Sequence, residues 1–201
     1  MGKLLIIGIL VLAFIYLILR RFNIFNNVTN TYSSNQNRNG IIEIGIPIRM
    51  LKSTVKKTLI TIGSGIFILL ITLVLAAKFK IALIMLPISL YLIGQYFLLS
   101  NHIKAIRSQR IVFDVNTNDV MVELSDRNVF SFNLDRDIKS LKEYKSVQKN
   151  NGIEFGFYQL KTNGNTINIP HLVLNNAQTK PFFDKLHHLD RQIETKLFPI
   201  I

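Results

Sequence analysis

Four histidines are the residues of this chain best suited to metal binding or acid–base chemistry, because the chain contains no cysteine. His187 and His188 are neighbours, and Asp184 lies four residues before His188. On a helix Asp184 and His188 would share one face and could supply two metal ligands, but no third ligand follows at a readable spacing. The pattern predicts a solvated helix face, and we expect neither a metal nor a cofactor.

The other candidates for chemistry are isolated from one another. His102 follows an apolar segment among basic residues, so we expect it to face lipid headgroups, and His171 lies in a turn without an obvious partner. Asp135 and Asp137 flank Arg136 in another turn, where capping or salt bridging is the expected role. The sequence has neither a glycine-rich phosphate loop nor a nucleophile elbow. We therefore expect no catalytic residues and no enzyme.

The net charge of +12 is concentrated in one half of the chain. Residues 1–110 contain thirteen Lys and Arg against a single acidic residue, Glu43, whereas residues 111–201 contain eleven of each sign. A nucleic-acid-binding protein is expected to carry its basic patch on its folded domain. Basic residues beside apolar segments instead favour membrane topology and contact with anionic lipid. We expect a lipid bilayer as a partner and no nucleic acid.

Three uncharged apolar segments occupy the first half of the chain, at residues 4–19, 58–77 and 81–99. A bilayer core requires about 20 helical residues, which the second and third segments provide and the first approaches. Arg20 and Arg21 follow the first segment in place of a small-residue cleavage site, so a retained anchor is favoured over a signal peptide. None of the three segments contains an ionisable residue, which disfavours a transporter acting alone.

Basic residues near the ends of the three segments predict their orientation. Ten lie in residues 20–57 and after the third segment, against three on the opposite side (Lys3, Lys78 and Lys80). The bias predicts a multi-pass protein of the cell membrane with its N-terminus outside, an external turn at residues 78–80 and a cytoplasmic C-terminal domain. The residues expected at the inner membrane interface are Arg20, Arg21, Arg49, Lys52, Lys56, Lys57, Lys104, Arg107 and Arg110.

Residues 22–57 form a linker that begins as a polar loop and ends in a basic amphipathic segment. At about 100° per residue, residues 48–57 separate an apolar face from a basic face, which is typical of a helix lying in the membrane interface. A cytosolic extension of the second span is the alternative. In that span, small residues form a face that another helix could approach closely: Thr61, Gly63, Ser64 and Gly65.

From residue 110 onward, short apolar segments alternate with turns, which predicts six antiparallel strands. They are expected at residues 111–115, 120–124, 129–134, 138–147, 153–162 and 166–169, with Asn163-Gly164 as a strong hairpin turn. A helix is expected from about Thr179 to Leu197, with Pro181 in its first turn. Its apolar stripe, expected to pack on the sheet, consists of Phe182, Leu186, Leu189, Ile193 and Leu197.

These elements resemble the bacterial membrane proteins with a pleckstrin-homology-like (PH-like) domain. The resemblance rests on three short motifs: Ile111-x-Phe113-Asp114, Asp137-Ile138, and Tyr158–Lys161 followed by Asn163–Ile169. It implies an α+β membrane protein in which three transmembrane helices precede a PH-like antiparallel β-sandwich or barrel with a C-terminal helix, at residues 101–201. The fold has seven strands, and residues 41–46 could supply the one that is missing.

The resemblance also implies a non-enzymatic scaffold or regulatory module that binds a protein partner or its own copies at the inner leaflet. Members that bind phosphoinositides use a basic loop between their first two strands, but the matching residues 116–119 contain no Lys or Arg. The candidate partner-binding residues are Lys139, Lys142, Lys145 and Lys149, for which a solvated strand face is the alternative. Two other functions stay open: an accessory subunit of a membrane transport or secretion complex, contacting its partner through residues 61–65, and a membrane immunity protein.

Overall fold

The computed structural model describes residue 16, residues 40–149, residues 152–174 and residues 176–201. The chain divides into two compact units, residues 1–33 and residues 34–201. In the first unit only Tyr16 is described, and it is helical. The rest of the expected first span, residues 4–19, and the expected interface residues Arg20 and Arg21 therefore lie outside the described residues.

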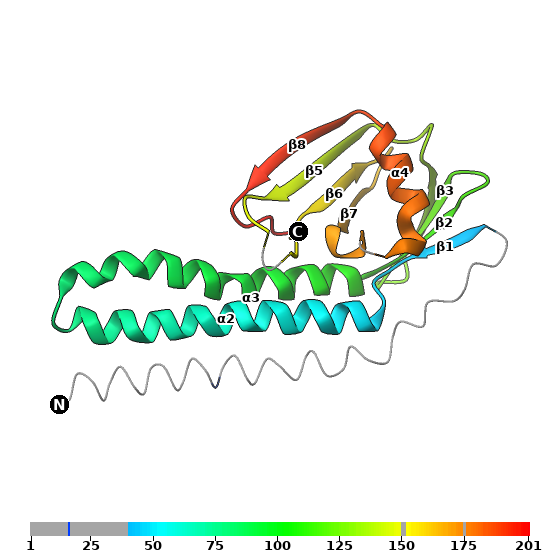
Figure 1. The fold of residues 1–201 in the computed structure, drawn as a ribbon. Coiled ribbons are helices and arrows are strands. Elements are labelled where there is room, and N and C mark those ends of the chain that lie inside the picture. Colours follow the sequence, from blue (N-terminus) through cyan, green and yellow to red (C-terminus); the bar gives the residue numbers. More distant parts are fainter. Residues whose placement is uncertain (1–15, 17–39, 150–151, 175) are drawn as a thin grey trace. The chain divides into compact units, whose positions relative to one another are not determined.

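Two long helices of the second unit pack side by side as a hairpin, shown in Figure 1. Helix α2 (Ile48–Ala76) is followed by a short turn, the 3₁₀ helix η2 (Lys80–Met85) and helix α3 (Leu86–Arg107). In the turn, the backbone N–H groups of Lys78 and Phe79 both donate to the carbonyl of Leu75. The tight connection expected at residues 78–80 is present.

Residues 48–57 are the first turns of α2 rather than a separate element. The expected amphipathic helix lying in the interface is therefore wrong, and the alternative, an extension of the second apolar segment, is correct. The physical reason is the absence of any glycine or proline between Ile48 and Ile62, so nothing ends the helix where the apolar segment begins. Leu51, Thr54 and Thr58 continue the buried face of the hairpin through this extension.

Eight strands form two four-stranded sheets. Sheet A has the order β1-β2-β3-β4 and is antiparallel throughout: β1 (Ile41–Ile44), β2 (Gln109–Asp114), β3 (Asp119–Leu124) and β4 (Val129–Asn133). Sheet B has the order β7-β6-β5-β8 and is antiparallel except between β5 and β8: β5 (Ser140–Ser146), β6 (Phe157–Lys161), β7 (Thr166–Pro170) and β8 (Arg191–Lys196). The six predicted strands are all present as β2 to β7.

The hairpin is inserted between two neighbouring strands of sheet A. Strand β1 pairs with β2 from Ile41 opposite Asp114 to Ile44 opposite Ile111. The further strand that residues 41–46 could supply is therefore present as β1. Only residues 45–47 separate β1 from α2, and only Ser108 separates α3 from β2. The first connector is held in place, because Ile46 is buried and the Asn176 side chain donates to the Gly45 carbonyl.

The prediction of a C-terminal helix is correct for the first half of the segment and wrong for the second half. Two short 3₁₀ helices, η3 (His171–Val173) and η4 (Ala177–Thr179), lead into helix α4 (Lys180–His188), and the chain then continues as β8, parallel to β5. Leu189 has an extended backbone with ψ 148°, which ends the helix. In the strand that follows, Ile193 is largely exposed, as is Leu197 after it, so neither packs on the sheet as part of a helical stripe.

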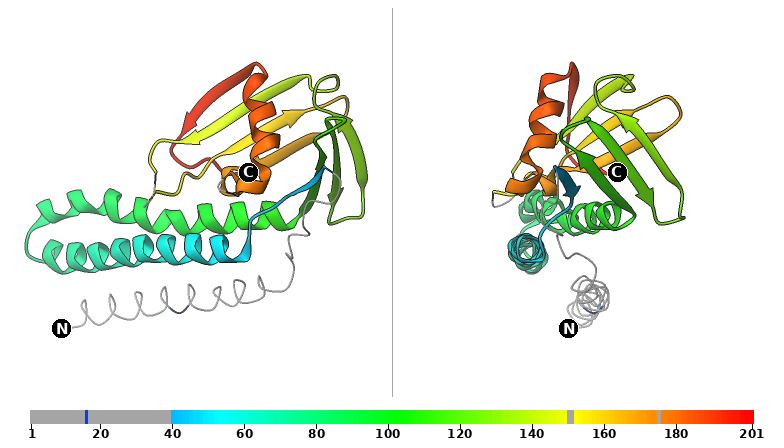
Figure 2. Two further views of the ribbon diagram at one scale, coloured as in Figure 1. Left: turned by 45° about the vertical axis from the view of Figure 1, so that its right-hand side comes forward. Right: turned by 90° about the vertical axis from the view of Figure 1, so that its right-hand side faces the viewer.

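Helix α4 covers the place where the two sheets meet (Figure 2). Its Phe182 ring lies 5.2 Å from the Phe113 ring of sheet A, and its Phe183 ring lies 5.8 Å from the Tyr158 ring of sheet B. Together with Leu186 these aromatic side chains are buried. The two sheets, α4, η3 and η4 are called the β domain below.

Candidate functional site

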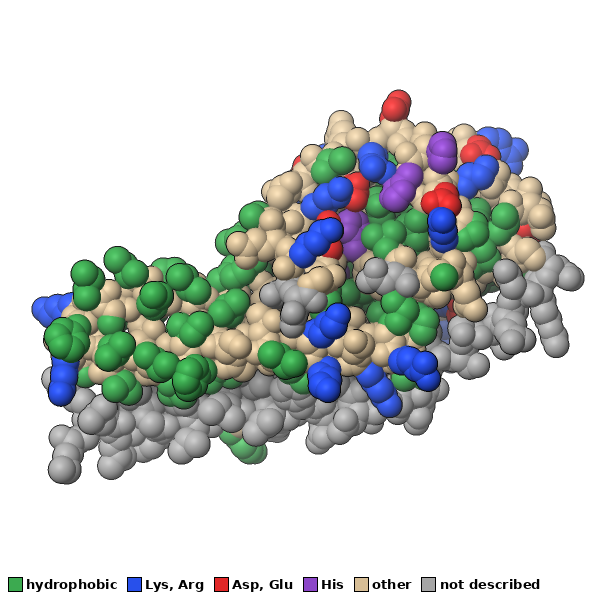
Figure 3. Space-filling model, viewed as in Figure 1, with side chains coloured by type: hydrophobic (Ala, Val, Ile, Leu, Met, Phe, Trp, Pro, Cys, Tyr) green, Lys and Arg blue, Asp and Glu red, His purple; other side chains and the backbone are tan. Residues whose placement is uncertain are grey.

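The hairpin carries its apolar side chains on the outside. Between Ile60 and Phe97, thirteen large apolar side chains are exposed, and Figure 3 shows them spread along the hairpin on the face in view. The residues buried in the same region include three small or hydroxyl-bearing ones, Gly65, Thr72 and Ser89, beside the larger Ile62, Ile93, Gln95 and Tyr96. The exposure of so many large apolar side chains is the opposite of the usual arrangement of a water-soluble helical pair.

The hydroxyl groups of this region are satisfied within their own helices. Thr58 donates to the carbonyl of Thr54 at 2.9 Å, and Thr72 donates to that of Ile68 at 2.8 Å. On α3, Ser89 donates to Leu86 at 2.8 Å. These hydrogen bonds need no water, which is the condition that an apolar solvent imposes on polar groups.

The apolar part of the hairpin has the length of a bilayer core. Lys57 and Lys78 bound it on α2, and a helix rises about 30 Å over that number of residues. Among the described residues, the segments Ile48–Ala76 and Lys80–Arg107 are long and apolar enough to cross a membrane, with mean hydropathy of 2.6 and 1.9. By this measure of length and composition alone, the chain has two candidate membrane spans in its described part.

The expected interface residues of the described part lie at the base of the hairpin, where it joins the β domain. Exposed side chains of the first turns of α2 supply four of them: Arg49, Lys52, Lys56 and Lys57. Lys104 and Arg107 lie in the last turn of α3. Arg110 lies on β2 and forms ion pairs with Glu43 at 2.9 Å and Glu123 at 3.8 Å. Figure 3 shows Lys and Arg side chains at the base and at the tip of the hairpin.

The four residues of the expected helix-packing face divide between two environments. Gly65 faces α3, where an added Cβ atom would lie 2.7 Å from Cβ of Leu92 and 3.1 Å from the backbone N of Ile93. Gly63 faces away, with no atom of the described residues within 4 Å of the same position, and Ser64 is exposed beside it. Thr61 is half-buried and donates to the Lys57 carbonyl. Only Gly65 is needed for the contact between α2 and α3.

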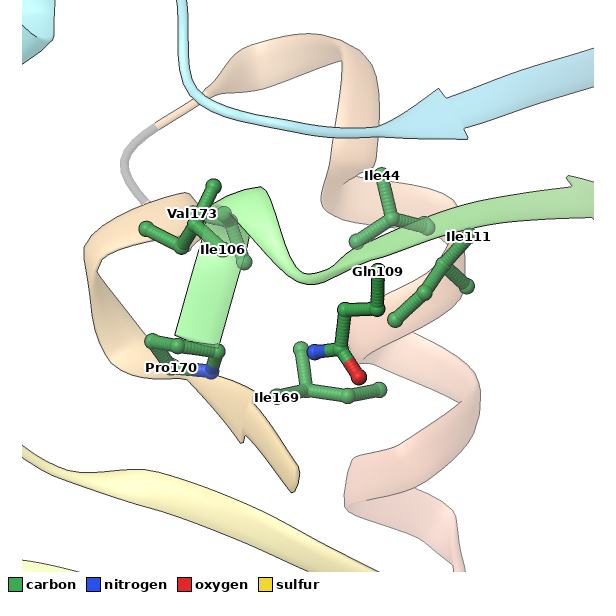
Figure 4. Close-up of a pocket in the computed structure, with 7 residues that line it drawn as sticks. All are labelled: Ile44, Ile106, Gln109, Ile111, Ile169, Pro170 and Val173. Atoms are coloured by element: carbon green, nitrogen blue, oxygen red, sulfur yellow. The ribbon is translucent and has the colours of Figure 1, made fainter. Parts of the chain in front are cut away.

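A small cavity marks the junction of the hairpin with both sheets (Figure 4). It has a volume of about 10 Å³, which is room for about one water molecule. Its lining comes from β1, α3, β2, β7 and η3: Ile44, Ile106, Gln109, Ile111, Ile169, Pro170 and Val173. The Gln109 side chain donates to the Asn168 carbonyl. The junction is closely packed and mostly apolar, so it fixes the hairpin to the β domain and does not hold a small molecule.

The β domain contains a buried ionic cluster around Glu143 of β5. Nε of Arg191, on β8, lies 3.1 Å from Oε2 of Glu143, and Nζ of Lys145 lies 3.4 Å from Oε1. The hydroxyl of Tyr158, on β6, donates to the same Oε1 at 3.2 Å, and Nε2 of His171 lies 3.6 Å from it. The two basic side chains balance the charge of the carboxylate, so it is buried with its partners.

Two histidines extend this cluster. Nε2 of His187, on α4, lies 2.9 Å from the Tyr158 hydroxyl, within hydrogen-bond distance. Burial and the neighbouring Glu143 charge raise the pKa of Tyr158, so its hydroxyl keeps its proton. Burial lowers the pKa of His171 to about 4, although the Glu143 carboxylate acts in the opposite direction, so His171 is neutral near pH 7. The cluster joins β5, β6, β8, η3 and α4.

Sequence reasoning missed this cluster. His171 was expected to lack a partner, but it lies beside Glu143. His187 is on an exposed helix face as expected, and only its contact with Tyr158 was not foreseen. His102 was expected at the headgroups, but it is fully buried, with Nε2 donating to the Pro199 carbonyl at 2.9 Å. The one available signal was Glu143, an acidic residue that shares its strand face with the apolar Leu141.

Other expected residues have ordinary structural roles. Asp135 accepts a hydrogen bond from the Asn118 side chain, and Asp137 accepts one from the backbone N–H of Asn133, as expected for capping carboxylates. His188 donates through Nδ1 to the Asp184 carbonyl. Within the residues that the structure describes, no group of three or more His, Asp or Glu is arranged to hold a metal ion.

The expected partner-binding lysines form ion pairs on the β domain. Three of the four pair with acidic residues: Lys142 with Glu194 at 3.1 Å, Lys145 with Glu143 at 3.4 Å and Lys149 with Glu154 at 3.2 Å. Lys139 is exposed. Because most of its charge is balanced by neighbouring acids, the run carries only a weak positive field.

No protein-family model, no curated protein and no solved structure matches this chain. The molecule is accordingly described by its own architecture, an α+β protein with two sheets and two long apolar helices. The PH-like resemblance stays a prediction.

Proposed function

We propose that the chain is a membrane-anchored module without catalytic activity, whose β domain binds a protein partner or a second copy of the chain at the inner face of the cell membrane. The observation that carries the proposal is the exposure of thirteen large apolar side chains along the hairpin, while its buried residues include glycine, serine and threonine. Lipid stabilises such a pair of helices, whereas water would destabilise it.

The connections between the hairpin and sheet A support a scaffold function. A domain joined to its anchor by residues 45–47 and by Ser108 cannot move far from the membrane or turn freely relative to it. A module held in this way presents the same surface to the cytoplasm at all times. This property favours recognition of a partner that is itself at the membrane.

The strand order supports the PH-like interpretation. With β1 included, seven strands precede α4, in a group of four and a group of three. When β1 is counted as the first strand, the hairpin is the connection between the first two strands. In phosphoinositide-binding proteins with a PH-like domain, this connection is a basic loop. Strand β8, which runs parallel to β5, is an addition to that fold.

Orientation in the proposal follows the basic residues, with the hairpin tip outside and the β domain in the cytoplasm. The absence of cysteine makes this testable with single-cysteine variants of the full chain. Phe79→Cys lies at the exposed tip, and Val129→Cys lies on the exposed edge strand β4. A membrane-impermeant thiol reagent is expected to label Phe79→Cys in intact cells and Val129→Cys only after permeabilisation.

Two results would overturn the proposal. Release of the chain from vesicles by alkaline carbonate would show that the hairpin is not embedded in lipid. Labelling of Val129→Cys in intact cells would leave the anchoring in place and reverse the orientation.

One observation favours a second candidate, an accessory subunit of a larger membrane complex. On the face of α2 that carries Gly63 and Ser64, no atom from the part of the chain that the structure describes lies within 4 Å of the Gly63 position. Small residues at such a position allow a neighbouring helix to approach closely. The Gly63→Leu variant described in the Discussion separates this candidate from binding through the β domain.

A further inference from the structure

The chain turns back along α3 after β8 and exposes apolar side chains there. Leu197 is 53% exposed and Ile200 is 60% exposed, although both are large and apolar. Between them, the Phe198 ring lies 5.4 Å from the ring of Tyr91. The same ring lies 3.0 Å from the position that a Cβ atom on Gly94 would occupy, so glycine at this position allows the close approach. Residues 197–201 are called the C-terminal segment below.

Hydrogen bonds to α3 hold the C-terminal segment in place. The Asn101 side chain donates to the main-chain oxygen of Ile201 at 3.1 Å and accepts from its N–H at 2.8 Å. The buried His102 donates to the carbonyl of Pro199 at 2.9 Å. Three hydrogen bonds to two neighbouring residues of one helix fix the direction in which the exposed side chains of this segment point. Their exposure is therefore a built feature of the fold.

The level of this contact along the hairpin can be derived from the packing of the two helices. Gly65 of α2 lies against Ser89, Leu92 and Ile93 of α3. The two helices are antiparallel, and Lys57 lies about two turns before Gly65 on α2. Lys57 is therefore level with the part of α3 that lies about two turns after Tyr91. The Phe198 ring on Tyr91 thus lies about 12 Å beyond Lys57 along the hairpin, beside its exposed apolar surface.

We infer that the C-terminal segment is a second membrane contact, in which Leu197 enters the acyl region of the inner leaflet beside α3 and Ile200 lies at the boundary of that region. The inference rests on the proposed function, because it takes the hairpin to span the bilayer. Lipid acyl chains are the occupant that fits, since the exposed side chains are apolar and the Phe198 ring between them lies beside the apolar surface of the hairpin. Amphipathic segments bind the interface in the same way.

The second contact would define how the β domain meets the membrane. Strand β8 and its parallel neighbour β5 end on the side of the hairpin, as Figure 1 shows. A contact at the end of β8, added to the anchor at β1 and β2, attaches sheet B as well as sheet A to the bilayer. The β domain would then have one fixed orientation on the inner leaflet.

Single tryptophans test this inference, because the chain contains none. The variants Leu197→Trp and Ile193→Trp are a matched pair, since both positions are 53% exposed and they lie four residues apart. Ile193, inside β8, is about 13 Å farther along the strand from the hairpin. Phe67→Trp, on the exposed apolar surface of α2, is the positive control. The full-length variants would be reconstituted into phosphatidylcholine–phosphatidylglycerol vesicles with or without brominated acyl chains.

Leu197→Trp is expected to lose about half of its fluorescence in the brominated vesicles, and Ile200→Trp, an independent second position nearer the β domain, is expected to lose a smaller part. Ile193→Trp is expected to keep its fluorescence. If Phe67→Trp is quenched and both C-terminal variants behave as Ile193→Trp does, the inference is overturned and the anchoring stands. If Phe67→Trp is not quenched either, both the inference and the proposed function are overturned.

Discussion

The hairpin and the β domain are built from similar residues but bury them in opposite ways. In the β domain the apolar side chains of Phe113, Val122 and Leu160 are buried in the core. In the hairpin, Phe67 and Ile84 are exposed, while Thr72 and Ser89 are buried. One chain therefore has two surfaces suited to two solvents, and the boundary between them lies close to Lys57. The difference teaches that the burial pattern, more than the composition, indicates which solvent each region meets.

The two regions also differ in how they treat charge. The apolar part of the hairpin, between Lys57 and Lys78 on α2, contains no ionisable side chain. The β domain buries a carboxylate, Glu143, together with its basic partners. A buried charge is tolerated only when its partners are present. The comparison therefore predicts that the β domain is sensitive to loss of a charge and the hairpin is sensitive to a change of volume.

The largest effect is expected from Arg191→Met, which leaves Glu143 buried without its closest basic partner. Breaking a buried ion pair in this way is expected to lower the free energy of unfolding by about 4 kcal/mol. The matched control is Lys142→Met, which removes the more exposed pair with Glu194 and should cost less than about 1 kcal/mol. Thermal unfolding of the full chain in mild detergent measures both. Equal losses in the two variants would contradict a structural role for the cluster.

A pH dependence of the β domain should follow from His171. Its pKa in the folded state, about 4, lies below the ordinary value of 6.5, so the unfolded chain binds more protons between these values. Stability is therefore complete above about pH 6.5 and falls as the pH decreases toward 4, by up to about 3 kcal/mol. Unfolding measured between pH 7.5 and pH 4.5 is expected to show this slope. His171→Gln should make the slope shallower, and an unchanged slope in that variant would assign the dependence to other groups.

A smaller effect is expected from Gly65→Leu in the hairpin. The added side chain meets Cβ of Leu92 and the backbone of Ile93, and such overpacking should cost about 2 kcal/mol. Gly63→Leu is the matched control, because its side chain would meet no atom of the described residues and should change stability by less than about 0.5 kcal/mol. Detergent-induced unfolding compares the two variants.

The same Gly63→Leu variant tests the subunit hypothesis. If partner proteins that co-purify with the chain in mild detergent are lost in this stable variant, the open face of α2 is the contact. If they persist and are lost only when residues 111–201 are removed, binding takes place through the β domain.

The smallest effect is expected from Arg110→Met at the exposed surface of sheet A. Its ion pairs with Glu43 and Glu123 are solvent-exposed, so the loss should be below about 1 kcal/mol. High salt should reduce the difference between the variant and the wild type further, because it screens exposed pairs. A loss of stability above about 1 kcal/mol that persists in high salt would contradict this prediction. It would show that the Arg110–Glu43 ion pair, in addition to the backbone hydrogen bonds, holds β1 on β2.

The sequence predicted the elements whose causes are local. Strands β2 to β7 follow from alternation and turn residues, such as Asn163-Gly164 between β6 and β7, and the hairpin follows from two apolar runs. Strand β8 was missed because Leu189, Ile193 and Leu197 also repeat at a helical spacing. Nothing near them in sequence reveals that the edge of β5 is open to a parallel partner.

The ionic cluster was missed for the same reason. Glu143, Tyr158, His171 and Arg191 come from four elements that are brought together only by strand pairing at long sequence distance. The environment of His102 was misjudged because an apolar run followed by basic residues predicts a membrane boundary, whereas the β domain and the C-terminal segment cover this part of α3.

The insertion of the hairpin between β1 and β2 has a consequence for the order of folding. Ile44 and Ile111 are opposite one another in the sheet but are separated by the whole hairpin in the chain. Bringing them together without it would require closing a long flexible loop, which costs conformational entropy. Once α2 and α3 have paired, their ends place the two strands side by side. Pairing of β1 with β2 is therefore expected to follow assembly of the helices, so sheet A is completed only after the hairpin has formed.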